Sequence, residues 1–134
     1  TCIVLPLLGW IWANLHGVDS HGVSNMLRSY VGGYNSGEPN PRPDWRIVLE
    51  TPATANIDSD TGLGIIVAPK SMEIAIEKAR NTGIGMVTIN NARHLGRASY
   101  HALMAVKHDM IGMCMTSCPT GVLSTFGAEP PRRS

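Results

Sequence analysis

Met86-Val87-Thr88-Ile89-Asn90 is a short run rich in β-branched residues, and such a run predicts a β-strand. We expect a helix over residues 97–108 and a second strand over residues 110–116. This order makes a β-α-β unit, whose two strands are parallel and end at the same edge of one sheet. The last third of the chain therefore predicts an α/β fold.

Polar residues follow both predicted strands at that edge. Arg93 and His94 come after the first strand, and Ser117 and Cys118 come after the second. Ligands of open α/β sheets bind at this edge, and loops there carry chemistry more often than structure. We therefore expect His94 and Ser117 to lie together in a cleft, although without this argument Ser117 is only a turn residue before Pro119.

A second candidate site is the run Gly17-Val18-Asp19-Ser20-His21-Gly22. It precedes a segment whose apolar residues have the spacing of an amphipathic helix, which Gly32-Gly33 can terminate. His21 is therefore expected in or beside a first helical turn, where the helix dipole favours a neutral imidazole. The apolar stripe consists of Val23, Met26, Leu27, Tyr30 and Val31.

His21, Asn25 and Arg28 have helical spacing and would share one face. A proton-transfer group, an amide and a fixed positive charge on one wall suit a small substrate that bears a carboxylate. The alternative is structural: His21 bonds to the backbone, and Asp19 or Ser20 only caps the helix.

The middle of the chain predicts a connector and further α/β elements. Three prolines within residues 37–44 indicate an extended linker between a helical segment at 1–44 and an α/β region at 45–134. Strands are expected at 47–50 and 54–57, and a helix from Pro69 to about residue 81, with Gly83 as its stop. The apolar residues 3–13 predict a buried helix or strand, since the run is too short to span a bilayer.

Composition excludes several classes of protein. The 134 residues suit one domain, and 11 basic against 10 acidic side chains, without a basic block, argue against nucleic-acid binding. The odd set of cysteines, Cys2, Cys114 and Cys118, fits reduced thiols in the cytoplasm. His94, His101 and His108 recur every seven residues, but no HExxH or paired Cys/His cluster is present, so we expect no metal site.

The motifs leave two further functional interpretations open at this point. Ser20 and His21 match the second half of a GxSxG elbow, so a serine hydrolase using Ser20 or Ser117 with a histidine is conceivable. The chain could also be a non-catalytic fragment that binds a partner through its apolar ends. A GxGxxG dinucleotide fingerprint is absent from the sequence.

Several strings, taken in order, resemble the malate/L-lactate dehydrogenase family, which includes sulfolactate, ureidoglycolate and diketogulonate oxidoreductases. The strings lie at 13–24 (with Asp-Ser-His-Gly), 40–43, 57–64, 83–85, 94–96 and 126–130. The resemblance implies a mixed sheet with helices and a nicotinamide-binding fold that is not Rossmann-like. It also implies NAD- or NADP-dependent interconversion of a small 2-hydroxy acid and its 2-keto acid in a cytoplasmic homodimer.

The resemblance also implies roles for individual residues. His21 and His94 correspond to histidines with acid-base roles in different members, and Ser20 and Ser117 are expected to contact the substrate. Many members have an arginine four residues after the motif histidine. Here Asn25 stands in that place, so Arg28 is expected to substitute for it. The residues expected to contact the cofactor are His94, Gly96 and Thr116.

The two ends of the chain depart from the family pattern. Residues 1–12 do not predict the amphipathic first helix of the family, because Pro6 interrupts them and they lack a polar face. Residues 131–134 replace a stretch that in the family continues toward the cofactor domain. We therefore expect the chain to be a fragment whose cofactor site is largely absent.

Overall fold

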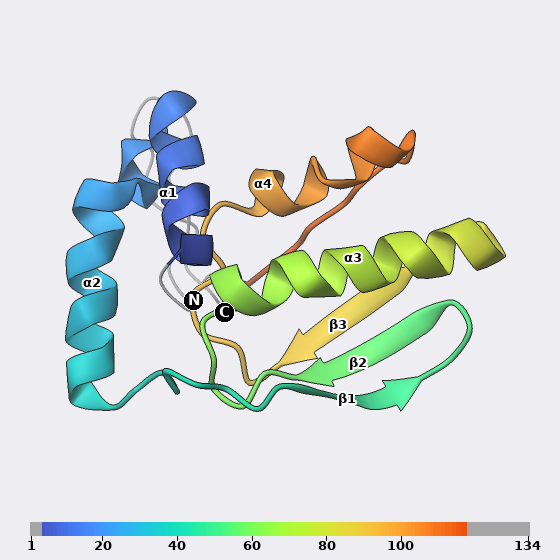
Figure 1. Cartoon of the computed structure of the whole chain (residues 1–134), viewed down its shortest axis with the longest axis horizontal. Helices are drawn as coiled ribbons and strands as arrows, with labels where there is room; N and C mark the ends of the chain where they lie inside the picture. Colours follow the sequence, from blue (N-terminus) through green and yellow to red (C-terminus); the bar gives the residue numbers. More distant parts are fainter. Residues whose placement is uncertain (1–3, 118–134) are drawn as a thin grey trace, which may run out of the picture.

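The computed structural model describes residues 4–117, and Figure 1 shows a helical pair beside a sheet that is covered by one long helix. The predicted α/β class with a mixed sheet is confirmed. The elements in chain order are α1 (Val4–Leu15), η1 (Asp19–His21), α2 (Val23–Ser36), β1 (Arg46–Glu50), β2 (Thr54–Asp58), α3 (Gly64–Thr82), β3 (Met86–Asn90), α4 (Ala98–Ala102) and η2 (Ala105–His108).

The sheet has three strands in the order β1-β2-β3. β1 pairs with β2 antiparallel, and β2 pairs with β3 in parallel, with α3 as the crossover between them. Asp58 and Asn90, the last residues of β2 and β3, are register partners. The β-α-β unit of this chain is therefore β2-α3-β3, and its carboxyl edge carries the loops that follow Asp58 and Asn90.

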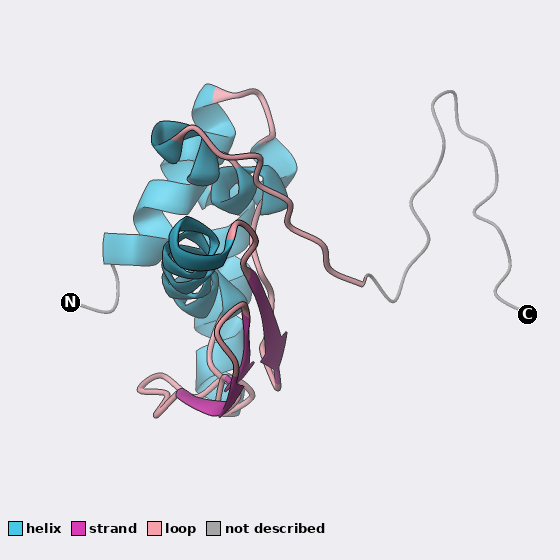
Figure 2. Cartoon of the chain, turned by 90° about the vertical axis from the view of Figure 1, so that its right-hand side faces the viewer, coloured by secondary structure: helices cyan, strands magenta, loops and turns pink. Residues whose placement is uncertain are grey.

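The β-α-β unit predicted for residues 86–116 is wrong in its second half. The predicted helix over 97–108 is divided into α4 and η2, and residues 110–117 form no strand. Gly112 lies against the break between the two helices, where a Cβ would meet the carbonyl oxygen of Ala102 at 2.0 Å. In Figure 2 the last described residues run away from the helices and the sheet, and within residues 4–117 no strand pairs with the outer edge of β3.

Of the helix or strand expected at residues 3–13, the structure forms the helix α1. Pro6 does not interrupt it, because it lies in the first turn, where the backbone N–H groups need no helical acceptor. Two predicted helix boundaries need correction. α2 continues past Gly32 and ends at Gly37, which has a left-handed φ of 76°. α3 begins at Gly64 rather than at Pro69, which lies inside the helix.

A small apolar cluster joins the helical pair to α3. Trp10 from α1, Tyr30 from α2 and the pair Leu63 and Ile65 at the start of α3 are all buried. Of the apolar stripe expected on α2, only Tyr30 is buried, whereas Leu27 and Val31 are exposed. The cluster therefore places the motif before α2 close to the start of α3.

Within residues 4–117, no helix combines the length and apolar character needed to cross a membrane. The boundary expected at residue 44 lies between α2 and β1 and stays a prediction. Cys114 is a free, partly buried thiol, and burial raises its pKa. The expectations for Cys2 and Cys118 lie outside the described residues.

Candidate active site

His21 is the last residue of η1, a single 3-10 turn that directly precedes α2. Asn14 on α1 fixes this turn, since its Nδ2 donates to Asp19 Oδ1 at 2.7 Å and its Oδ1 accepts from the Val23 N–H at 2.9 Å. The second bond caps α2, so neither Asp19 nor Ser20 performs the capping that the structural alternative assigned to them.

Gly22 allows this arrangement because it leaves room for the Asn14 amide. A Cβ on Gly22 would lie 2.2 Å from Asn14 Nδ2. The Asp-Ser-His-Gly motif is therefore a tight turn that holds His21 beside the start of α2, partly buried and outside the helix proper.

His94 lies in the loop after β3, at the carboxyl edge of the sheet. The first turn of α3 anchors this loop, because the N–H groups of Gly64 and Ile65 donate to the carbonyl oxygens of Arg93 and His94, each at 3.2 Å. These are N–H groups that a helix leaves without an internal acceptor. Since a Cβ on Gly64 would lie 2.6 Å from the Arg93 carbonyl oxygen, only glycine fits there.

The structure brings the two candidate histidines together. The rings of His21 and His94 are stacked, with centroids 5.5 Å apart and planes inclined by 25°. His94 is exposed as a residue, but desolvation of its ring lowers its pKa, and His21 lowers it further by charge repulsion. Both effects favour the neutral form of the His94 imidazole at neutral pH.

Tyr30 on α2 completes the cluster. Its hydroxyl forms a short hydrogen bond with His94 Nδ1, and the Gly96 N–H donates to the same nitrogen at 3.2 Å. Tyr30 is buried, and burial raises its pKa to about 12. Two elements far apart in sequence, α2 and the loop after β3, therefore meet through one ring nitrogen.

Three further predicted residues, Ser20, Asn25 and Arg28, differ in whether they contact this cluster. Ser20 Oγ is 3.0 Å from His21 Nδ1, so Ser20 belongs to the cluster. Asn25 Nδ2 donates to the Asp19 carbonyl oxygen at 3.1 Å, which supports η1. Arg28 is exposed on α2, and among the described residues it makes no ion pair.

Thr116 and Ser117 are exposed in the segment that forms no strand. The argument that brought Ser117 beside His94 depended on two parallel strands, and the second of these is absent from residues 4–117. The strand argument therefore no longer supports a place for Ser117 beside His94. The cofactor contact expected of Thr116 and the substrate contact expected of Ser117 stay predictions.

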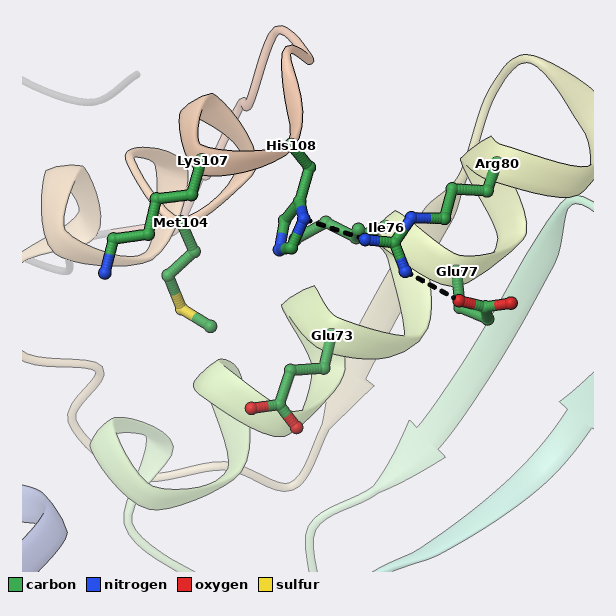
Figure 3. Close-up of a pocket in the computed structure, with 7 residues that line it drawn as sticks. All are labelled: Glu73, Ile76, Glu77, Arg80, Met104, Lys107 and His108. Carbon is green, nitrogen blue, oxygen red and sulfur yellow. Dashed lines mark hydrogen bonds and ion pairs between the residues drawn. The ribbon is translucent and has the colours of Figure 1, made fainter.

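A separate pocket of about 370 Å³ lies between α3 and η2 (Figure 3). Three of its polar side chains pair with one another, since Arg80 contacts His108 Nδ1 at 2.8 Å and Glu77 at 3.1 Å. None of the predicted site residues lines it, so it is distinct from the histidine cluster. No group of three metal-ligating side chains occurs within residues 4–117.

Sequence reasoning did not find Asn14 or Tyr30. A signal for Tyr30 existed, because a tyrosine in the middle of a buried stripe needs a partner for its hydroxyl. Asn14 gave no local signal, since it caps a helix nine residues away.

The sequence profile of the family described as malate/L-lactate dehydrogenase matches residues 9–131. This chain belongs to the malate/L-lactate dehydrogenase family. The fold class and the resemblance stated from sequence are thereby confirmed.

Relatives in this family include two archaeal enzymes. The chain is 47% identical over 119 residues to malate dehydrogenase of Pyrococcus abyssi, covering 89% of this chain and 33% of that protein. It is 44% identical over 117 residues to L-sulfolactate dehydrogenase of Methanocaldococcus jannaschii, covering 87% and 34%. Nothing among the named relatives supports the hydrolase alternative.

A solved structure extends the comparison to the fold. Malate dehydrogenase from Entamoeba histolytica superimposes with a TM-score of 0.81 at 37% identity, over 91% of this chain and 34% of that one. The chain thus spans about a third of the length of the relatives it matches.

Proposed function

We propose that the protein containing this chain is an oxidoreductase that interconverts a small 2-hydroxy acid and its 2-keto acid with NAD or NADP. The stacked pair of His21 and His94 at the carboxyl edge of the sheet is the observation that supports this most directly. Hydride leaves the carbinol carbon as a proton leaves its hydroxyl, so an imidazole must stand within hydrogen-bond reach of that oxygen. Relatives named malate, sulfolactate and ureidoglycolate dehydrogenases agree with this chemistry.

The side chains around the pair suit the rest of such a substrate. Ser20 is hydrogen-bonded to His21 and can orient its ring. Arg28 supplies a permanent positive charge from α2, and a guanidinium binds a carboxylate through paired hydrogen bonds. Asn25 supports the turn beside it, and Ser117 is proposed as a further substrate contact.

The chain offers part of a nicotinamide site. Directly after the loop that carries His94 and Gly96, Arg97 Nη1 and Ser99 Oγ are buried, and within residues 4–117 neither has a hydrogen-bond partner. Buried polar atoms without partners fit a ligand that brings polar groups of its own. We propose that His94, Gly96 and Thr116 border this side of the cofactor, which supplies or accepts the hydride when bound.

Three further features complete the proposal. The protein is a homodimer, it acts in the cytoplasm, and its helical segment at 1–44 carries the Asp-Ser-His-Gly motif toward the α/β region at 45–134. The named relatives act on hydroxy acids of different kinds, so malate, lactate and sulfolactate are the candidate substrates.

The test is a coupled absorbance assay at the nicotinamide band. The longer protein that contains this chain is mixed with NADH or NADPH and, in turn, with pyruvate, oxaloacetate and sulfopyruvate. Loss of the reduced-nicotinamide band with one of these acids supports the proposal and identifies both substrate and coenzyme. Absence of turnover with every pair, in a protein shown to be folded, contradicts it.

A further inference from the structure

Tyr30 contacts His94 and helps to position its imidazole ring. Tyr30 is 6% exposed, and its ring packs against Trp10 with centroids 5.1 Å apart. Its hydroxyl bonds to His94 Nδ1. A buried hydroxyl without a partner costs free energy, so this hydrogen bond holds the hydroxyl and the imidazole in fixed positions relative to each other.

The second partner of His94 Nδ1 determines where the imidazole proton lies. The Gly96 N–H donates to Nδ1 at 3.2 Å, and a backbone N–H can only donate. Nδ1 therefore has its lone pair free to accept, and the proton of the neutral ring is on Nε2. The Tyr30 hydroxyl meets the same lone pair, so it also donates.

Protonation of His94 would reverse this pattern. An imidazolium carries N–H groups at both ring nitrogens, so a proton on Nδ1 would face the fixed Gly96 N–H. Within residues 4–117, the titratable side chains in contact with the His94 ring are His21 from η1 and Tyr30 from α2, and neither offers a negative charge to offset it. Burial and repulsion from His21 act in the same direction, because they lower the pKa of His94.

His21 has a different partner. Its Nδ1 lies 3.0 Å from Ser20 Oγ, and a hydroxyl can either donate or accept. Ser20 can therefore accommodate His21 both as neutral imidazole and as imidazolium. The Gly96 N–H thus fixes the role of Nδ1 in His94, whereas the hydroxyl at Nδ1 of His21 leaves both roles open.

We propose that Tyr30 is a positioning residue that holds His94 as the neutral Nε2–H tautomer, so that His94 donates a hydrogen bond to the substrate oxygen while His21 moves the proton. This inference rests on the proposed function. In reduction of the 2-keto acid, the His21 imidazolium gives its proton to the carbonyl oxygen as hydride reaches the carbon. His21 is then neutral, and His94 keeps its proton throughout; oxidation is the reverse.

Nuclear magnetic resonance of ¹⁵N-histidine-labelled protein tests the tautomer without any assay of activity. Long-range ¹H–¹⁵N correlations distinguish a protonated from an unprotonated ring nitrogen. In the unmodified protein we expect His94 to have its proton on Nε2. A proton on Nδ1 would overturn the proposal, whatever substrate the enzyme is found to use.

The variant Tyr30→Phe tests the role of the hydroxyl. Loss of one donor to Nδ1 should move the protonation of His94 to higher pH in the same spectra, because the neutral form is less stabilised. In the dehydrogenase, kcat should fall by about tenfold with little change in KM, since about 1.4 kcal/mol of hydrogen bonding is a factor of ten.

Tyr100→Phe is the matched control, because Tyr100 is a partly buried tyrosine that packs on the edge of Trp12 rather than on His94. We expect it to leave both the His94 titration and kcat unchanged. An unaltered titration and an unaltered kcat in folded Tyr30→Phe would overturn the role given to Tyr30. If the protein lacks dehydrogenase activity but the spectra show the expected tautomer and its shift, only the proposed function fails.

Discussion

Two histidines in this chain are held in environments that favour the neutral ring. His101 is 1% exposed, and its Nε2 bonds to the Leu95 carbonyl oxygen at 3.0 Å. Burial lowers the pKa of both His101 and His94 below the ordinary value of 6.5. Because the unfolded chain takes up these protons at higher pH than the folded one, the free energy of unfolding should fall as pH falls below about 6.5.

The variant His101→Gln should reduce this pH dependence. Glutamine does not titrate, so the slope of the free energy of unfolding against pH should become shallower between pH 6.5 and 5, measured by urea denaturation. Ser71→Ala is the control, since Ser71 is a buried polar residue that bonds to Val67 without titrating. It should lower stability at every pH and leave the slope intact; an equal slope in His101→Gln and in the unmodified chain would contradict the argument.

The two candidate histidines were both predicted from sequence, although partly by an incorrect route. His94 was placed at a strand edge by pairing residues 86–90 with residues 110–116, whereas its true parallel partner is β2. The rule held because it depends only on where a strand ends. Asn14 and Tyr30 could not be derived in this way, since their contacts with the motif and with His94 form only after the helices pack.

At the scale of elements, close backbone approaches decide where the loops lie. Gly64 admits the carbonyl oxygen of Arg93 to the first turn of α3. This contact also explains why α3 starts before Pro69, because carbonyl oxygens of the loop after β3 accept from the first N–H groups of the helix. The local sequence cannot indicate such a contact. The division of the predicted 97–108 helix also reflects tertiary contact, since Gly112 packs against the break.

Replacement of Gly64 by alanine should displace the loop that holds His94. The new Cβ would meet backbone atoms, which cannot move aside cheaply, so we expect a loss of about 1–3 kcal/mol in stability and a loss of turnover in the proposed nicotinamide assay. Gly32→Ala is the control, because nothing lies within 4 Å of its added Cβ and alanine favours a helix. Gly64→Ala should therefore lower both the denaturation midpoint and turnover. Gly32→Ala should leave turnover unchanged and should leave the midpoint unchanged or raise it. Equal tolerance at both glycines would contradict this account.

At the scale of the whole molecule, the described part exposes much apolar surface. Leu15 on α1 is 78% exposed, and Ile111 after η2 is 99% exposed. Within residues 4–117, the outer edge of β3 also has no strand paired with it. Exposed apolar patches and open strand edges promote association.

We therefore predict that the isolated 134-residue chain associates as its concentration rises. Sedimentation velocity should show an increasing sedimentation coefficient between low and high micromolar protein, and Leu15→Ser together with Ile111→Ser should reduce the effect. A single monomeric species at all concentrations would contradict this prediction, because the exposed apolar surfaces would then not cause association.

The claim that His21 and His94 act together at one site is tested most directly in the proposed nicotinamide assay, by comparing turnover of the unmodified protein with that of His21→Ala, His94→Ala and the double variant. Each single variant should lower kcat/KM by about 10²–10⁴-fold. Residues that act as a unit are not additive, so the double variant should be about as slow as the slower single one. Near-normal turnover in either single variant, or a double variant whose loss is the product of the two, would contradict the account.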